Sequence, residues 1–208
     1  MLYQKGIKME QKSFAVGLRI EHLQSFINEH QYGKYANHPS LKAADYKLAV
    51  KTSNGRGVYT FCMCPGGKVI NSSSEAGGIV VNGMSNQARD EANANSAVLV
   101  TVGPEDFASS HPLAGITYQR ELEQKAFELG GKDYSVPVMR VEDYLNDTLD
   151  LKMEEVSCSV QPNVRYAKLS QIFSNEVNLA LKEGLQLMNH KFTGFTEKAM
   201  LSGVESRS

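Results

Sequence analysis

The stretch Phe14–Glu21, FAVGLRIE, has a clear alternation of large apolar and other residues that is typical of a β-strand. Successive side chains of a strand point to opposite faces, so Phe14, Val16, Leu18 and Ile20 share one face while Gly17 and Arg19 lie on the other. This pattern predicts a half-buried strand. On such a strand we expect Arg19 to pair with Glu21 or with a residue of a neighbouring strand.

Six further stretches show strand patterns. Ser53–Gly57, SNGRG, contains Asn-Gly, which suits the positive φ of a tight turn and predicts a hairpin. The stretches GIVVNGM and SAVLVTV are nearly all apolar, which is typical of strands that are covered on both faces. The expected strands are Tyr46–Val50, Val58–Cys64, Lys68–Asn71, Gly78–Met84, Ser96–Val102 and Ala199–Arg207.

Apolar residues recur at helical spacing in three segments. They predict helices at Glu21–His30, Gly115–Gly130 and Leu169–Asn189. Ser85–Asn95 is expected to be a loop or a frayed turn of helix, and Val138–Ser170 shows no regular pattern. Strands and helices do not alternate strictly, which argues against a chain of βαβ units. The sequence therefore predicts an α+β fold, in which helices flank a mixed, largely antiparallel sheet.

The composition is that of a globular domain without a strongly charged partner. The 208 residues include 22 Lys and Arg against 23 Asp and Glu, so the net charge is -1, and the basic residues are scattered. This balance argues against nucleic acid or an anionic membrane surface as a partner. No apolar run is long enough to span a bilayer, and the N-terminal residues lack the apolar core of a secretion signal. Three cysteines favour a reducing compartment, so we expect a cytoplasmic protein.

The sequence shows no arrangement of reactive side chains that is typical of a self-contained enzyme. The histidines form neither HxxxH nor HExxH, and no CxxC occurs, so we predict no metal site. The nucleophile pattern GxSxG and the P-loop are missing, and the glycines of GGIVVNG are wrongly spaced for a dinucleotide fingerprint. The sequence therefore leaves the catalytic residues unassigned.

Two cysteines lie close together in Tyr59–Val69, YTFCMCPGGKV. On an extended strand the side chains of Cys62 and Cys64 point to one face about 7 Å apart, a geometry that disfavours a disulfide. They are either buried packing groups, neighbours of a ligand or reactive thiols.

The turn that follows these cysteines is the more informative feature. Pro65 ends the strand because it has no N–H to donate. Gly66 and Gly67 permit either a plain hairpin turn or a close approach of the backbone to another group. Both interpretations stay open on the residues alone.

Several segments together resemble a known family, the bacterial FAD-dependent dehydrogenases that are usually described as uncharacterised or NAD(FAD)-utilising. The chain is similar to the middle of these proteins, in order, at GIKMEQKSFAVGLRIEH, AADYKLAVKTSNGRGVYTFCMCPGGKVINSSSE, GGIVVNGMSNQARDEANANSAVLVTVGPEDF, PLAGITYQRELEQKAFELGG and SGVESRS. The resemblance covers nearly the whole chain and is weakest between Leu149 and Gln171.

The resemblance implies that residues 1–208 are a single domain of a longer FAD-dependent dehydrogenase, namely its inserted, substrate-side domain. Family members hold FAD on glycine-rich nucleotide-binding segments, which have no counterpart in the chain. The implied partners are the remaining flavin-binding segments of the full-length protein and a small-molecule substrate. FAD is the implied cofactor of the full-length protein, although this domain is not expected to hold it alone, and NAD(P)H is a further candidate.

In related flavoproteins the sheet of the inserted domain roofs the isoalloxazine ring and leaves a cavity for the substrate. The resemblance implies that a block at this roof binds the cofactor, consisting of Cys62, Met63, Cys64, Pro65, Gly66 and Gly67. The domain would orient the reacting groups and exclude water while the flavin carries the electrons. The alternative is a self-contained small-molecule binding module without redox chemistry.

Overall fold

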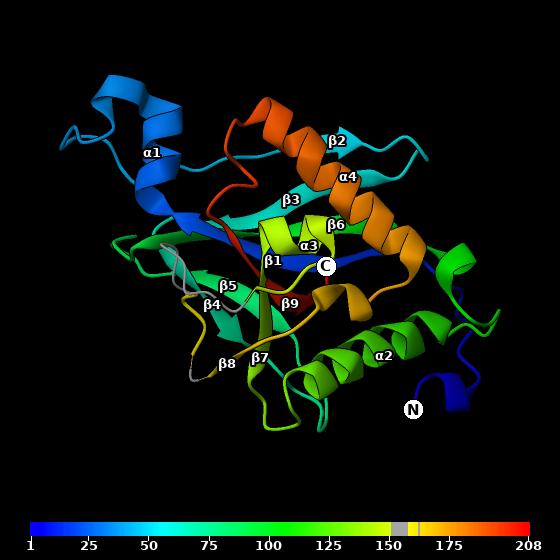
Figure 1. The fold of residues 1–208 in the computed structure, drawn as a ribbon. Helices are drawn as coiled ribbons and strands as arrows, with labels where there is room; N and C mark the ends of the chain where they lie inside the picture. Colours follow the sequence, from blue (N-terminus) through cyan, green and yellow to red (C-terminus); the bar gives the residue numbers. More distant parts are fainter. Residues whose placement is uncertain (151–157, 162) are drawn as a thin grey trace.

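A mixed sheet of seven strands lies at the centre of residues 1–150, 158–161 and 163–208, the part of the chain that the computed structural model describes (Figure 1). The strand order is β2-β3-β6-β1-β9-β7-β8, and every neighbouring pair is antiparallel except β7 and β8. The strands β4 and β5 form a separate antiparallel hairpin. The bounds are β1 Phe14–Leu23, β2 Ala49–Lys51, β3 Gly57–Cys64, β4 Gly67–Asn71, β5 Val81–Ser85, β6 Asn93–Val102, β7 Val136–Arg140, β8 Val164–Tyr166 and β9 Met200–Glu205.

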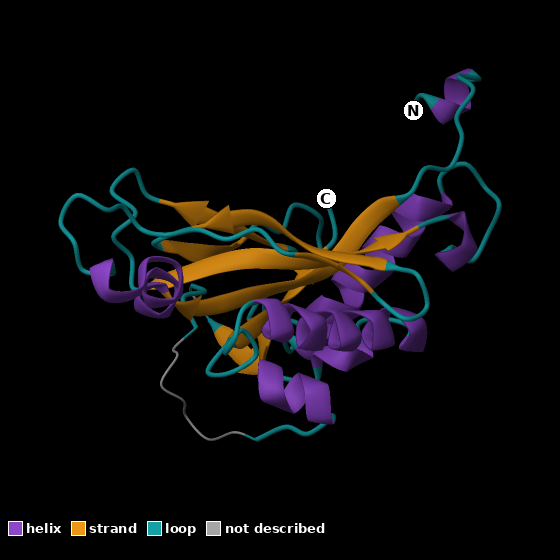
Figure 2. Ribbon diagram, turned by 90° about the horizontal axis from the view of Figure 1, so that it is seen from above, coloured by secondary structure: helices purple, strands orange, loops and turns teal. Residues whose placement is uncertain are grey.

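The helices α2, α3 and α4 lie together on one side of the sheet (Figure 2), and the β4–β5 hairpin covers part of the other side. Val16, Leu18 and Ile20 of β1 pack in the main core with apolar residues of α2 and α4, such as Leu122 and Leu181. This arrangement confirms the predicted α+β fold. The α-helices are α1 Gln24–Tyr32, α2 Ala114–Leu129, α3 Val141–Asn146 and α4 Asn175–Lys191, and short 3-10 helices span Tyr3–Lys5, Gly33–Tyr35, Pro104–Asp106 and Leu169–Gln171.

We call the sheet face opposite α2, α3 and α4 the outer face. Ala15, Ala97 and Leu99 form a small buried cluster there with the half-buried Tyr59, separate from the main core. Phe61 pairs with Ala97 across β3 and β6, so its side chain is on the same face. The ring of Phe61 is 52% exposed.

β1 is buried on both faces, so the prediction of a half-buried strand at Phe14–Glu21 is wrong. Arg19 and Glu21, on the outer face, are both 0% exposed. The hairpin covers Arg19 closely, since a Cβ on Gly83 of β5 would lie 2.3 Å from its Nη2. Polar residues tolerate this burial because they bond to one another: Arg19 donates to Glu205 of β9 at 2.9 Å, which confirms the expected partner on a neighbouring strand.

The hairpin predicted at Ser53–Gly57 is confirmed as the connection between β2 and β3. The loop predicted at Ser85–Asn95 ends too late, because β6 already begins at Asn93. Asn93 and Asn95 lie in this strand with buried side chains that bond to Glu21 and Arg19. Their polarity therefore reflects buried hydrogen bonds and not exposure to solvent.

The segment Val138–Ser170, which shows no regular pattern in the sequence, contains most of β7, α3 and β8 in its described part. Residues 151–157 and 162 lie outside the described residues. The helix predicted at Leu169–Asn189 is two elements, a 3-10 helix and α4. The side chain of Ser174 accepts a hydrogen bond from the N–H of Val177 and so marks the start of α4.

His22 of β1 lies in an aromatic cluster between the sheet and the segment after α4. Its ring packs against those of Phe26, Tyr46 and Phe195. Nε2 lies 2.7 Å from the carbonyl oxygen of Phe195, so the neutral ring donates from Nε2. Burial lowers the pKa of His22 to about 4, against the raising effect of this hydrogen bond.

Acidification should therefore weaken the fold through His22. The unfolded chain takes up this proton near pH 6.5 and the folded chain only near pH 4, so stability is lost as the pH falls between these values. The loss is at most about 3 kcal/mol. A His22→Gln variant keeps a donor for the carbonyl of Phe195 without titrating. Urea unfolding across this range should show a shallower pH dependence for the variant than for the native chain, and equal slopes would contradict the prediction.

Candidate functional site

The end of β3 contains a bulge at the predicted cofactor-binding block. Phe61 pairs with Ala97 and Cys64 with Asn95, so β3 has one residue more than β6 between these pairs. Cys62 takes up the extra length with a φ of +46°, in the left-handed region. The bulge breaks the regular alternation on which the shared face of Cys62 and Cys64 was predicted, and the two side chains differ in exposure, since Cys62 is exposed and Cys64 is buried.

The turn Pro65-Gly66-Gly67 is buried by the chain itself. The N–H of Gly66 donates to Oε1 of Gln24 at 2.6 Å. A Cβ on Gly66 would lie 1.9 Å from the carbonyl oxygen of Arg89, and one on Gly67 would lie 2.4 Å from that of Met84. The close backbone approach that the glycines permit is therefore made to neighbouring loops and strands of this domain.

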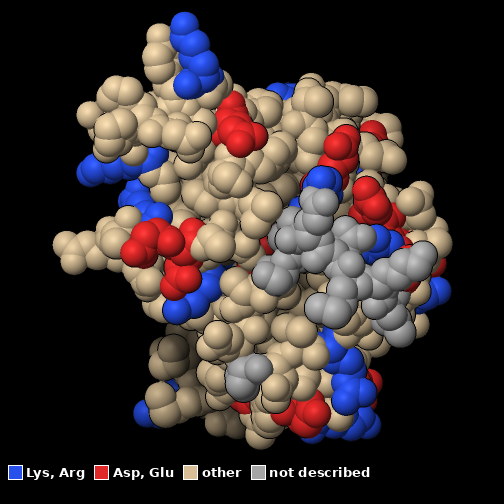
Figure 3. Space-filling model, turned by 60° about the vertical axis from the view of Figure 1, so that its left-hand side comes forward, with Lys and Arg blue, Asp and Glu red and all other residues tan. Residues whose placement is uncertain are grey.

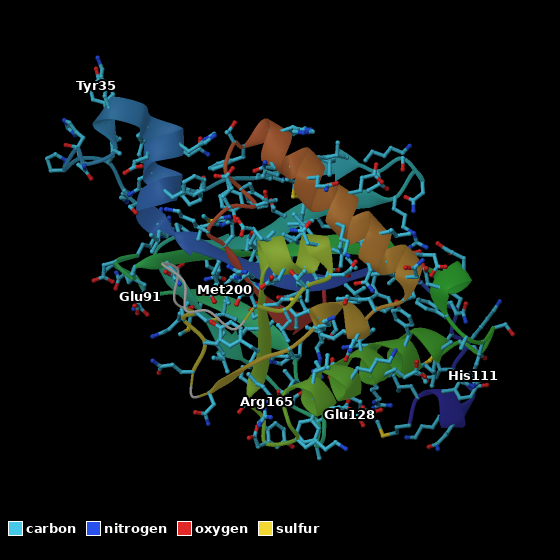
Figure 4. All side chains as sticks on the ribbon, viewed as in Figure 1. Tyr35, Glu91, His111, Glu128, Arg165 and Met200 are labelled. Carbon is cyan, nitrogen blue, oxygen red and sulfur yellow. The ribbon has the colours of Figure 1, made fainter. Side chains whose placement is uncertain are left out.

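The end of β5 and the loop between β5 and β6 hold this turn from the other side. Glu91, labelled in Figure 4, donates its N–H to the carbonyl oxygen of Gly66 at 3.3 Å. The hydroxyl of Ser85 donates to the carbonyl oxygen of Pro65 at 2.8 Å. Cofactor binding by the six-residue block stays a prediction, and its exposed members are Cys62 and, in part, Met63.

Arg19 connects the bulge to the rest of the outer face. Its Nη2 donates to the carbonyl oxygen of Cys62 at 2.6 Å, and its Nε donates to Oδ1 of Asn95 at 2.8 Å. Its Nη1 donates to Glu205 at 2.9 Å and to Oδ1 of Asn82 at 3.3 Å. One buried guanidinium thus joins β3, β5, β6 and β9. Burial raises the pKa of Glu205, and the nearby Arg19 opposes this shift.

Glu21 is a second buried charge on the outer face, and its partners are neutral. Nδ2 of Asn93 donates to it at 3.0 Å, and both the N–H and the hydroxyl of Ser159 donate to the same carboxylate. The thiol of Cys158, for which the sequence indicates no partner, donates to Oε1 at 3.1 Å. Burial and this carboxylate raise the pKa of Cys158 well above the ordinary thiol value, so it is an unreactive donor.

The residues at the C-terminal end of β9 are tied to the domain one after another. Ser206 and Arg207 donate to the buried carboxylate of Glu123 on α2, at 2.7 and 2.8 Å. The carbonyl oxygen of Ser208 accepts from the N–H of Ala15 on β1 at 3.0 Å. Burial raises the pKa of Glu123, but the hydrogen bonds from Arg207 and Ser206 outweigh it, and the net shift is downward.

Basic and acidic side chains are interspersed on the face that Figure 3 displays, without a large area of one sign. Among the described residues, no group of three or more His, Cys, Asp or Glu is placed to hold a metal ion. No helix in this part of the chain is long and apolar enough to cross a membrane.

The outer face and its strand-end bulge belong to a domain type that occurs in flavoproteins. The family model described as FAD-dependent protein, C-terminal domain-like, matches residues 13–208, and the chain belongs to this family. An uncharacterized protein from Clostridium beijerinckii is 47% identical over 210 residues, which cover 100% of this chain and 39% of that protein. The chain is therefore similar to a domain within a larger protein, and the FAD-dependent part of the predicted resemblance is confirmed.

Proposed function

We propose that this domain is the substrate-side part of a larger FAD-dependent oxidoreductase and that its outer face lies over the flavin. The observation that carries the proposal is the exposed ring of Phe61 beside the bulge, on the face opposite the helices. An exposed aromatic ring offers a flat apolar surface on which a planar ligand can stack. Membership of an FAD-dependent family makes the flavin the occupant that fits best.

The residues present fit one side of a flavin ring, which is flat and largely apolar. Phe61 supplies an aromatic surface, and its cross-strand neighbour Ala97 is a small residue that adds little bulk beside the ring. When bound, FAD would supply the electron transfer. The domain would exclude water from the ring and hold a small-molecule substrate against it.

The partners, the location and the reaction that we propose are those of the full-length protein. The partners are the flavin-binding segments of the full-length protein, and the proposed location is the cytoplasm. Dehydrogenase activity with NAD(P)H as the electron carrier follows from the resemblance. The full-length protein should be yellow with bound FAD, and residues 1–208 alone should be colourless. A colourless full-length protein would favour a binding module without redox chemistry.

A fluorescent reporter tests which face lies over the flavin. The domain has no Trp, so Phe61→Trp places a single indole on the outer face and Leu179→Trp places one on α4. Leu179 is 57% exposed on the helix side, which makes it a matched control. In the full-length protein, FAD should quench the added fluorescence strongly at position 61 and weakly at position 179, because energy transfer falls steeply with distance.

For each variant, the Trp fluorescence is measured with FAD bound and after FAD is removed, and the difference is the quenching. The same difference for the native protein is then subtracted, which leaves the quenching of the added Trp. Equal quenching at the two positions, or stronger quenching on α4, would place the flavin elsewhere and overturn the proposal.

A further inference from the structure

The side chain of Asn82 on β5 is held at the surface with its amide in one orientation. Oδ1 accepts from Nη1 of Arg19 at 3.3 Å and from the N–H of Gly83 at 2.8 Å. Since both bonds use the oxygen, the amide nitrogen is directed away from Arg19. Asn82 is exposed, and among the described residues no group accepts a hydrogen bond from its Nδ2.

This amide lies next to the bulge. The same guanidinium that donates to Asn82 donates from Nη2 to the carbonyl oxygen of Cys62 at 2.6 Å. Oδ1 of Asn82 and the carbonyl oxygen of Cys62 therefore both lie within hydrogen-bond distance of the planar guanidinium of Arg19. The exposed residues Cys62 and Asn82, with Phe61 preceding the bulge, form one short stretch of surface, which we call the bulge rim.

The packing of Arg19 fixes this donor before any ligand arrives. Arg19 is 0% exposed and bonds to four strands, so its guanidinium has no freedom to turn. Gly83 lets β5 lie directly on it, because a Cβ there would overlap the guanidinium. A donor held in this way loses little conformational entropy when it binds.

We propose that Nδ2 of Asn82 donates a hydrogen bond to a carbonyl or carboxylate oxygen bound at the bulge rim. This rests on the proposed function, which places the rim beside the flavin. The oxygen belongs either to the flavin ring or to the substrate, and both present the same acceptor chemistry. Phe61 offers the apolar surface against which the rest of the ligand packs.

Asn82→Asp in the full-length protein is the main test. The carboxylate keeps an acceptor for Arg19 and for the N–H of Gly83, but it loses the outward donor and carries a charge. Asn82→Ala removes the donor without adding a charge. Asn54→Asp is the matched control, since Oδ1 of Asn54 also accepts from its own turn, at the other end of β3. Melting temperatures report whether each variant folds.

Two measurements separate the sources of the oxygen. The first is the dissociation constant of FAD and its absorption spectrum without added ligand. The second is titration with benzoate, a carboxylate on an apolar ring, followed by the change in the flavin spectrum. A flavin acceptor predicts that FAD binds about tenfold or more weakly to Asn82→Asp. A substrate acceptor predicts unchanged FAD binding and about tenfold or more weaker benzoate binding. Asn82→Ala should show a smaller loss in the same measurement.

The inference is overturned if Asn82→Asp matches Asn54→Asp in both measurements, or if Asn82→Ala matches the native protein while only the charged variant changes. The Phe61→Trp reporter keeps the two proposals apart. If FAD quenches the Trp at position 61 but the Asn82 variants bind FAD and benzoate normally, only the inference about Asn82 is wrong. If FAD does not quench the Trp at position 61, the proposed function itself is wrong.

Discussion

Replacement of Arg19 by Met should lower the free energy of unfolding of the 208-residue chain by about 3–5 kcal/mol at neutral pH. The change leaves the carboxylate of Glu205 buried without its cation. It also removes the donor from the carbonyl oxygen of Cys62 and from Oδ1 of Asn95. Unpaired buried polar groups carry their full desolvation cost, which is why one substitution has so large an effect. Urea unfolding measures it.

The pH dependence of this variant identifies the charge that causes the loss. Burial raises the pKa of Glu205, and Arg19 opposes the shift, so removal of Arg19 raises this pKa further. A carboxyl whose folded-state pKa is raised gives stability that is fully present below its unfolded pKa and is lost as the pH rises through the folded value. The deficit of Arg19→Met should therefore shrink as the pH falls toward 4.5, the ordinary glutamate value.

Two further variants serve as controls. Arg120→Met breaks an ion pair with Glu75 whose side chains are 54% and 46% exposed, and it should leave stability nearly unchanged. The double variant Arg19→Met/Glu205→Gln removes the buried charge and should regain part of the loss. If the double variant is no more stable than Arg19→Met at neutral pH, the unpaired carboxylate is not the cause.

Local patterns in the sequence were sufficient for most strands. Alternation at Phe14–Glu21 and Asn-Gly at the hairpin are patterns of neighbouring residues. They correctly predicted β1 and the turn between β2 and β3. β7 has only five residues, contains Pro137 and is almost wholly buried, so its periodicity carries no signal. Ser174, which separates two helical segments, is indistinguishable from an exposed polar residue within one helix.

The site was predictable only in part, because its organising residue acts over long sequence distances. The segment around Cys62 stands out in the sequence. The hydrogen-bond partners of Arg19, however, lie 43, 63, 76 and 186 residues away from Arg19 along the chain. Spacing rules for motifs cover neighbours and helical turns, not such cross-strand contacts. The full burial of Arg19 and the orientation of Asn82 therefore emerge only from the folded chain.

Gly66→Ala should destabilise the chain by about 3 kcal/mol or more. Gly66 has a φ of +46°, which strains any residue with a side chain. The added methyl group would also lie 1.9 Å from the carbonyl oxygen and 2.2 Å from the carbonyl carbon of Arg89. The backbone must move to accept it, and this would weaken the hydrogen bond from the N–H of Gly66 to Gln24.

Gly55→Ala separates strain from overlap. Gly55 has a φ of +83°, but the nearest atom to its added Cβ is the flexible end of Lys51 at 3.9 Å. This control should lose only the strain, about 1–2 kcal/mol. The family resemblance implies that Gly66 lies at the flavin roof, so that a side chain there would lower turnover directly, whereas the packing against Arg89 makes loss of stability the primary effect. Unfolding midpoints and turnover of the full-length variants distinguish the effect on turnover from the effect on stability. A Gly66→Ala protein that is as stable as Gly55→Ala but has lower turnover would support a direct contact between Gly66 and the cofactor.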